Sequence, residues 1–403
     1  MSADGNHGIP QGSDWQPRTR MVHSGIRRSQ YGEVAEAIFL TQGFVYPDAE
    51  TAARRFEHSG PDEFIYARYG NPTVRMFEDR IADLEGTEAA FATASGMAAV
   101  SAALTSLLQA GDRVVAARAL FGSCLYILDK VLRRFGVDVV LVDGTSLDEW
   151  RAAVTPGTKA VFFESMSNPT LEIIDIAAVA EIAHAAGALV IADNVFATPV
   201  GSRAVELGVD VVVYSATKHI DGQGRCLGGV ICGTEEFIRK TVEPYVKHTG
   251  GALSPFNAWV MLKGIETMEL RVAAQSASAQ ALAEALEGDP KLSKVIYPGL
   301  ASHPQAALAK RQMPNGGTLI ALELAGGQAA AFRFLNALRL FTITNNLGDS
   351  KSLVTHPATT THSSMTEEQR LAAGVTPGLV RISLGIEATA DILADVKAAL
   401  AAV

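Results

Sequence analysis

The sequence predicts an α/β protein with a mostly parallel central sheet and helices on both faces. Strand-like runs rich in Val, Ile and Ala recur at regular intervals, and helical patterns lie between them. This alternation is typical of a parallel sheet whose strands are buried on both sides. The five runs are DRVVAA from residue 112, VDVVLVD from 137, TKAVFFES from 158, ALVIADN from 188 and DVVVYS from 210.

Two segments before these strands predict further elements. The segment PTVRMFEDRIADLEG carries an apolar stripe of helical period between Pro72 and Gly86, which predicts a helix over 72–85. The segment AAFATASGMAAVSAALTSLL predicts a short strand, a turn at Ser95 and Gly96, and a helix from about Met97. A junction of this kind directs unpaired backbone N–H groups towards a bound anion.

The sequence pattern changes after about residue 262. Longer amphipathic helices such as AQSASAQALAEALEG alternate there with short strands such as GTLIALELAGG and GLVRISLGI, while GGVICG predicts one more strand of the central sheet. We therefore expect three parts. They are an N-terminal arm over 1–62 that contacts a neighbouring subunit, a large α/β domain over 63–262 that binds the cofactor, and a smaller α+β domain over 263–403.

Composition excludes several classes of protein. A net charge of −9 disfavours a nucleic-acid partner, and no apolar run reaches the roughly 18 residues that a membrane span needs. The N-terminus lacks the apolar core of a signal peptide, so we expect a cytoplasmic protein without a membrane partner. Three scattered cysteines (Cys124, Cys226 and Cys232) indicate neither a disulfide framework nor a zinc site.

Polar residues gather where the predicted strands end, which is where ligands bind in an open parallel sheet. Glu164 and Asn168 follow one strand, Asp193 follows the next, and Ser215, Thr217 and Lys218 follow a third. Taken singly, a lysine after a strand or an aspartate before a helix is more often structural. Together they suit pyridoxal 5′-phosphate, since a lysine forms the Schiff base, an acid pairs with the ring nitrogen, and N–H and O–H donors hold the phosphate.

The same segments resemble, in order, the motifs of the Cys/Met-metabolism pyridoxal-phosphate enzymes. The resemblance extends over nearly the whole chain beyond about residue 20, and it implies the fold-type I (aspartate aminotransferase-like) architecture. The motifs are YARYGNPT (66–73), TASGMAA (93–99), ESMSNPT (164–170), IADN (191–194), YSATKHIDGQG (214–224), LGDSKSLVTHPATTTHS (347–363) and RISLGIE (381–387).

The resemblance implies a role for each matching residue. Lys218 is the Schiff-base lysine and Asp193 the partner of the ring nitrogen. Arg381 pairs with the substrate α-carboxylate, a task that suits its planar guanidinium, and two residues, Asn168 and Ser352, assist it. Phosphate contacts are implied for Gly96, Met97, Ser215 and Thr217 and, towards the phosphate of a neighbouring subunit, for Tyr66 and Arg68. Active sites are thus shared across a dimer, and the family commonly forms homotetramers.

One position departs from the family pattern. Phe121 stands where most relatives have a tyrosine stacked on the cofactor ring, so the aromatic face is kept and the hydroxyl is lost. Proton transfers assigned to that hydroxyl elsewhere must fall here to Lys218 or to another group, for which Tyr66 is one candidate.

Within the family, LFGSC, LSPFNAW and HPATTTH are most similar to the enzymes that exchange the succinyl group of O-succinylhomoserine for sulfide. The resemblance implies this transferase reaction, which gives homocysteine and succinate in methionine biosynthesis. There are four alternatives to this reaction. The nucleophile could be cysteine, as in cystathionine γ-synthase, or the substrate could be the acetyl ester. The protein could instead be a γ-lyase acting on methionine or cystathionine, or a non-catalytic scaffold. No metal is expected, because His356 and His362 lack an evident third ligand. The glycines of DGQGRCLG do not match the dinucleotide fingerprint.

Overall fold

The computed structural model describes residues 14–60 and 62–403. The chain divides into two compact units. Unit 1 contains the chain up to Leu107 together with Val211–Asp221 and Arg225–Thr267, and unit 2 contains Leu108–Asp210, Gly222–Gly224 and Met268–Val403. The first 13 residues of the expected N-terminal arm lie outside the described residues. The three-part division at residues 62 and 262 stays a prediction.

Unit 1 combines three strands with helices. Strand β7 pairs antiparallel with β1 on one side and with β6 on the other. The predicted strand GGVICG is therefore confirmed as β7. The elements of unit 1 are α1 (Pro17–His23), α2 (Ala49–Glu57), α3 (Pro72–Glu85), β1 (Ala89–Thr93), α4 (Gly96–Thr105), β6 (Val211–Tyr214), β7 (Gly229–Gly233), a π-helix (Phe237–Val242), α9 (Glu243–Thr249) and α10 (Pro255–Ile265).

Helix α3 has the bounds that the sequence predicts. Asn71 caps its N-terminus by accepting the N–H of Thr73, Pro72 occupies the first turn, and Gly86 ends it in the left-handed conformation at φ 88°. Glycine adopts this conformation without the steric cost that other residues pay. Helix α4 begins at Gly96, one residue before the predicted start.

Buried ion pairs hold the segment before α3 against that helix. Arg80 is fully buried, and its guanidinium lies 2.5 Å from a carboxylate oxygen of Glu36. Arg20 donates to Asp83 over 2.9 Å. Because a buried charge without a partner is costly, these pairs fix the path of the N-terminal segment over α3.

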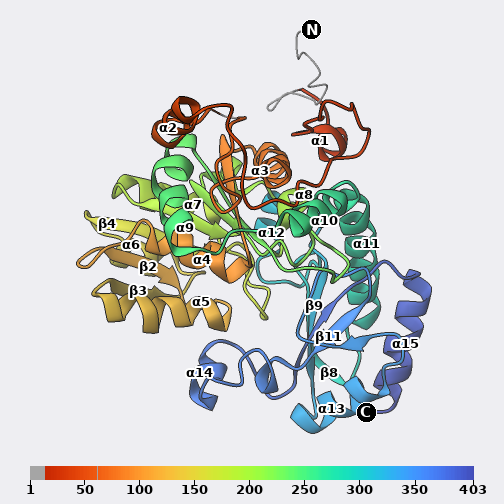
Figure 1. Cartoon of the computed structure of the whole chain (residues 1–403). Coiled ribbons are helices and arrows are strands. Elements are labelled where there is room, and N and C mark those ends of the chain that lie inside the picture. Colours follow the sequence, from red (N-terminus) through yellow and green to blue (C-terminus); the bar gives the residue numbers. More distant parts are fainter. Residues whose placement is uncertain (1–13, 61) are drawn as a thin grey trace. The chain divides into compact units, whose positions relative to one another are not determined.

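Unit 2 contains four parallel strands in the order β5, β4, β2 and β3. In Figure 1 strands β2, β3 and β4 lie side by side. All five predicted runs form strands, namely β2 (Arg113–Ala117), β3 (Asp138–Val142), β4 (Thr158–Glu164), β5 (Leu189–Asp193) and β6 of unit 1. Among β1 to β7, three of the strand pairs that lie within one unit are parallel, and the two pairs that involve β7 are antiparallel.

The helical segments between these strands vary in type. The run CLYILDKVLRRFG, expected as one helical pattern, forms α5 (Gly122–Tyr126), then a π-helix (Ile127–Leu132) and a 3₁₀ turn (Arg133–Phe135). An apolar pattern alone does not separate these helix types. The other segments are α6 (Leu147–Ala153), α7 (Ile176–Ala185), α8 (Thr198–Gly201) and a 3₁₀ turn (Ala204–Leu207).

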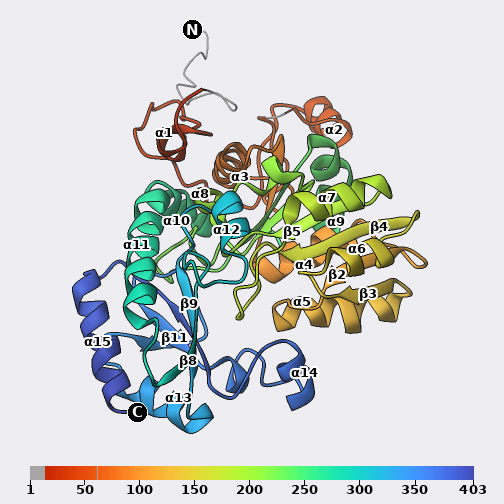
Figure 2. The same ribbon diagram turned by 180° about the vertical axis from the view of Figure 1, so that it is seen from behind.

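The C-terminal part of unit 2 is built on a second sheet, with the strand order β10, β11, β12, β9 and β8. Figure 2 shows α11 and α15 beside this sheet, and the two helices are in contact. The elements are α11 (Met268–Leu286), β8 (Leu292–Ile296), α12 (Ala306–Gln312), β9 (Leu319–Leu324), α13 (Gly327–Ala337), β10 (Thr342–Ile343), β11 (Leu353–Thr355), a 3₁₀ turn (Pro357–Thr359), α14 (Glu367–Ala372), β12 (Leu379–Ser383) and α15 (Thr389–Ala401).

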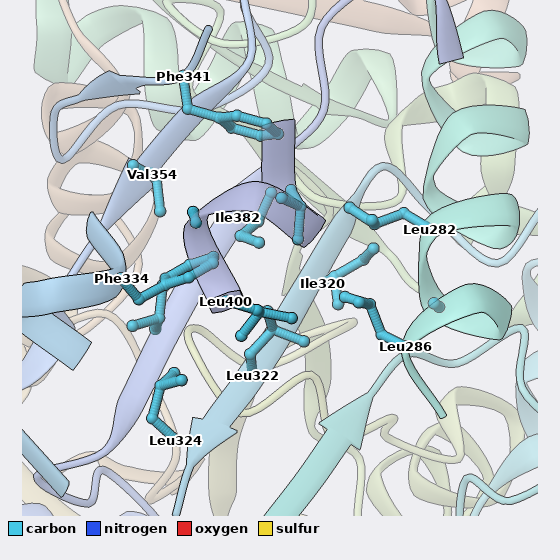
Figure 3. Packing of buried hydrophobic residues seen from close by; sticks show 14 of the residues in the cluster. Leu282, Leu286, Ile320, Leu322, Leu324, Phe334, Phe341, Val354, Ile382 and Leu400 are labelled. Carbon is cyan, nitrogen blue, oxygen red and sulfur yellow. The ribbon is translucent and has the colours of Figure 1, made fainter. Parts of the chain in front are cut away.

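A continuous apolar core supports this second sheet (Figure 3). Leu282 and Leu286 of α11 meet Ile320 and Leu322 of β9, and Leu400 of α15 belongs to the same cluster. The predicted α+β character of this part is confirmed. Among residues 14–60 and 62–403, no helix combines the length and the apolar character needed to cross a bilayer.

Candidate functional site

The first group of predicted site residues lies at the N-terminus of α4 in unit 1. Strand β1 ends at Thr93, and Ser95 caps α4 by accepting the N–H of Ala98 over 3.1 Å. The N–H groups of Gly96 and Met97 belong to the first turn, which has no partners within a helix. They therefore form a place where the helix favours an anionic group.

Gly96 packs directly against the turn that follows β6. A Cβ atom at residue 96 would lie 2.5 Å from the Cβ atom of Ser215, a distance that real Cβ atoms do not show. Only glycine permits this approach. The structure thus brings the helix N-terminus and the Ser215 hydroxyl together, as the phosphate role predicts for them.

Lys218 stands in the turn after β6. Its backbone N–H donates to the Ser215 carbonyl over 3.1 Å, and the residue is half-buried. The Thr217 hydroxyl donates to the Gly228 carbonyl at 3.2 Å and accepts the N–H of Gly228 at 3.1 Å. These bonds anchor the turn on the residue before β7, so the backbone that carries Lys218 has a fixed conformation.

Tyr66 and Arg68 also belong to unit 1. Tyr66 is exposed, and the Arg68 guanidinium stacks 5.4 Å from its ring centroid and 4.9 Å from that of Tyr69. Arg68 also donates to the backbone carbonyl of Lys247. The two predicted residues thus form one cationic and aromatic group on the surface of the unit.

The second group of site residues lies in unit 2, at the ends of β4 and β5. Glu164 and Asp193 are register partners in the parallel pair. An oxygen of each carboxylate and the Cys124 sulfur lie within 4.8 Å of one another. The sequence predicted Glu164 and Asp193 at the ends of these strands but not Cys124 beside them, because nothing in the spacing of Cys124 shows that the start of α5 reaches the strand ends.

Burial controls the protonation of this cluster. Desolvation, and next the charge of Asp193, raise the pKa of Glu164 to about 8, although two backbone N–H groups and Arg381 favour the ionised form. Desolvation also raises the pKa of the Cys124 thiol, and the negative charges of Glu164 and Asp193 raise this pKa further. The thiol is therefore neutral and packs as a small apolar group.

Arg381 lies on β12 with 1% of its surface exposed. It donates to the Asn168 side-chain oxygen over 2.8 Å and to the carbonyls of Asn345 and Asn346 over 2.9 and 3.1 Å. Burial lowers its pKa to about 10, and Glu164 opposes that shift. The structure therefore brings Arg381 and Asn168 into contact, although the two residues lie far apart in the sequence.

Arg381 also keeps an unused donor. Its Nε is buried, and within the described part of the chain it has no hydrogen-bond partner. An unsatisfied buried donor is costly, and a carboxylate oxygen would satisfy this one. This unpaired donor in unit 2 would suit an anionic ligand.

Two further polar residues of unit 2 are His362 and Ser352, and both are buried. The His362 Nδ1 lies 2.8 Å from the Thr361 hydroxyl. Burial, followed by the charge of Arg381, lowers the pKa of His362 to about 4, so the imidazole is neutral. The Ser352 hydroxyl donates to Glu387 over 2.9 Å. The substrate role of Ser352 stays a prediction.

Phe121 stands immediately before α5 with a half-buried side chain, and its backbone N–H donates to Glu164 over 2.6 Å. The residues fit pyridoxal phosphate. Unit 1 has a lysine near a helix N-terminus whose close packing requires glycine at position 96. Unit 2 has an aromatic side chain and a carboxylate at the end of a strand.

His356 bonds to Thr359 and to the Pro377 carbonyl, as expected for a structural histidine.

The comparisons with known proteins agree with this chemistry. Residues 18–401 match the family model described as Cys/Met metabolism PLP-dependent enzyme. The chain belongs to this family. It is therefore a pyridoxal-phosphate-dependent enzyme, and the predicted cofactor, fold class and family are confirmed.

Individual members of the Cys/Met-metabolism family are similar over almost the whole chain. An O-succinylhomoserine sulfhydrylase of Mycobacterium tuberculosis is 55% identical over 94% of both chains, and one of Pseudomonas aeruginosa is 48% identical over 95% of both. The structure of an O-acetylhomoserine (thiol)-lyase, described as putative, of Campylobacter jejuni has a TM-score of 0.92 at 31% identity. That match covers 96% of this chain and all of the other, which carries N′-pyridoxyl-lysine-5′-monophosphate.

Proposed function

We propose that the protein is an O-succinylhomoserine sulfhydrylase of methionine biosynthesis. It would replace the succinyl group of O-succinyl-L-homoserine by sulfide, giving L-homocysteine and succinate. The observation that carries the choice of substrate is the 55% and 48% identity to relatives of that description. The buried Nε of Arg381 supports an amino-acid substrate, because it is a donor suited to an α-carboxylate.

The proposed cofactor contacts are those that the family resemblance implies. Lys218 would hold it covalently, Gly96, Met97, Ser215 and Thr217 would bind its phosphate, Phe121 would stack on its ring, and Asp193 would pair with the ring nitrogen. In support, the α4 N-terminus provides N–H donors beside Ser215, and Asp193 ends a strand next to Phe121's partner Glu164. Pyridoxal phosphate, when bound, supplies an electron-accepting ring that makes protons at Cα and Cβ of an amino acid removable.

The chain's own residues would then orient the substrate and move protons. Arg381 and Asn168 would hold the α-carboxylate, so that the Cα–H bond faces the Lys218 amine. Lys218 Nζ would take the Cα proton as a general base. A second proton leaves Cβ, the Cγ–O bond breaks to release succinate, and the Cγ–S bond to sulfide forms.

Phe121 limits which group can serve in these transfers. Its ring has no ionisable atom, so the Lys218 amine is the assigned base at Cα and the donor on the return. Tyr66 is the other candidate for these proton transfers, and it would come from the neighbouring subunit. Arg68 would reach the phosphate from the same side, and Ser352 would assist at the carboxylate end.

Steady-state assays with two esters and two nucleophiles test this function. We expect homocysteine and succinate from O-succinylhomoserine with sulfide, at a kcat/KM at least about tenfold above that with the acetyl ester or with cysteine. Preference for cysteine would identify a cystathionine γ-synthase, and preference for the acetyl ester an O-acetylhomoserine sulfhydrylase. Release of 2-oxobutanoate without added nucleophile would identify a γ-lyase.

We further propose a cytoplasmic homotetramer built from dimers that share their active sites. In the described part of the chain, nine of the eighteen exposed large hydrophobic side chains lie between residues 15 and 66, among them Val34 and Val45, which are 90% and 92% exposed. A surface of this kind favours contact with another protein chain. Light scattering during size-exclusion chromatography measures the mass of the assembly and so tests for a tetramer. Val45→Asp should lower this mass towards that of dimers or monomers.

A further inference from the structure

Glu164 occupies a position that the proposed reaction does not use. It ends β4 beside Asp193 at the end of β5, and the Cys124 thiol completes a cluster whose polar atoms lie within 4.8 Å of one another. The side chain of Glu164 is almost fully buried. A second carboxylate this close to the one assigned to the ring nitrogen requires an explanation, because two buried like charges repel strongly.

Both oxygens of Glu164 receive backbone hydrogen bonds. Oε1 accepts the N–H of Phe121 over 2.6 Å, and Oε2 accepts the N–H of Asn168 over 3.1 Å. Asn168 in turn accepts from Arg381 over 2.8 Å. Glu164 is therefore linked to the ring-stacking residue, to the carboxylate-binding pair and, through the register of the strands, to Asp193.

The charges around Glu164 decide its ionisation. Asp193 faces it from β5, the Cys124 thiol from α5, and Arg381 from β12. The two N–H groups and Arg381 favour a carboxylate, whereas desolvation and Asp193 favour the neutral acid. The second pair of effects is larger, so the pKa rises to about 8. These effects favour a neutral acid at Glu164 beside Asp193, as is usual when two carboxyl groups lie close together in a buried site.

We propose that Glu164 is a positioning residue that holds its proton and donates it in a hydrogen bond to Asp193. Asp193 is then the ionised member of the pair, with its orientation fixed by its neighbour. This inference rests on the proposed role of Asp193 at the cofactor ring nitrogen, for which an ionised and oriented carboxylate is required. It adds that the neutral acid beside Asp193 is part of the cofactor site.

Infrared difference spectroscopy on the purified holoenzyme at pH 7 tests the proton directly, without substrate. We expect the C=O stretch of a protonated carboxyl in the wild type and its loss in Glu164→Gln. The matched control is Glu172→Gln, since Glu172 is also partly buried and has a raised pKa, but its like-charged neighbour is Asp143. Absence of the band from the wild type, or its loss in the control variant, would overturn the proposal.

Asp193→Asn tests the hydrogen bond between the pair. Removing the neighbouring charge should let Glu164 ionise more readily, so the band should disappear at a pH lower by about one unit or more. An unchanged titration would show that Asp193 does not hold the proton on Glu164, and would overturn the proposal.

Cofactor affinity separates positioning from simple packing. Glu164→Gln keeps a neutral donor towards Asp193 and one of the two acceptors for the backbone N–H groups. Its pyridoxal-phosphate Kd should therefore rise by no more than about threefold, and the visible absorption maximum should not shift. Glu164→Ala leaves two backbone N–H groups without their acceptor, and its Kd should rise about tenfold. Equal loss in both variants would overturn the proposal. None of these measurements depends on the sulfhydrylation reaction, so failure of the proposed function would be seen separately, in the turnover assay.

Discussion

The two units present their predicted site residues in different ways. Unit 1 presents backbone N–H groups and short hydroxyls around Lys218, in turns fixed by glycines such as Gly96. Unit 2 presents buried side chains whose charges are set by burial, such as Glu164, His362 and Arg381. The first arrangement suits a constant phosphate group, and the second suits recognition of a particular amino acid. Substitutions in unit 1 should therefore abolish cofactor attachment, and those in unit 2 should alter affinity and pH dependence.

The largest effect is expected for Lys218→Ala in unit 1. Loss of the only proposed covalent anchor and base should lower kcat by about a thousandfold or more. Borohydride reduction of the wild type followed by peptide mapping should place the cofactor adduct on Lys218. Lys351→Ala, which changes an exposed lysine of unit 2, is the matched control. An adduct on any other lysine would contradict the assignment of unit 1.

Arg381→Lys should affect substrate binding, the role proposed for unit 2, without affecting cofactor attachment, the role proposed for unit 1. An ammonium group cannot reproduce the fork that reaches both Asn168 and the carbonyls of the 345–346 segment, so KM for O-succinylhomoserine should rise about 30- to 100-fold. The visible absorption of the bound cofactor should not change. Arg339→Lys, on the surface of unit 2, should leave both quantities as in the wild type. A lost cofactor spectrum would show that Arg381 supports the cofactor rather than the substrate.

His362→Gln should change stability in acid. The wild-type imidazole has a folded-state pKa of about 4, below the ordinary 6.5, so the unfolded chain binds a proton at a higher pH than the folded protein does. Stability is therefore full above pH 6.5 and is lost as the pH falls towards 4. From pH 7 to 5 this amounts to about 2 kcal/mol.

Urea unfolding at pH 7 and pH 5 measures this difference. The variant should lose about 2 kcal/mol less than the wild type between the two pH values, whereas His23→Gln, an exposed site in unit 1, should behave like the wild type. Equal pH dependence in all three proteins would mean that the pKa of His362 in the folded protein is not lowered from its ordinary value.

The smallest effect is expected for Phe121→Tyr. If Lys218 carries the proton transfers, the restored hydroxyl should change kcat by less than about threefold, although general acid–base groups can contribute a hundredfold or more. The pH profile of kcat for the two proteins checks this. A gain above about tenfold would show that unit 2 lacks a needed proton donor.

The strands and the main helices were predictable from sequence because their signals are local. Pro72, Asn71 and Gly86 define α3 by themselves, and the apolar runs that become β2 to β7 are bounded by polar residues. The roles of Lys218, Asp193 and Arg381 followed from motif order and remain proposals. What the sequence could not show was contact between distant segments. The approach of Cys124 to Glu164 depends on where the start of α5 lies. The lowered pKa of His362 depends on its burial beside Arg381.

The buried contact between Glu36 and Arg80 has a practical consequence for handling the protein. Cleavage by a protease after about residue 40 would remove Glu36 from the buried Arg80 guanidinium. Glu266, 4.0 Å away, would remain as an acidic neighbour. Proteolytic clipping in that stretch should therefore lower the melting temperature of the whole first unit, even though the cut lies far along the chain from the lysine.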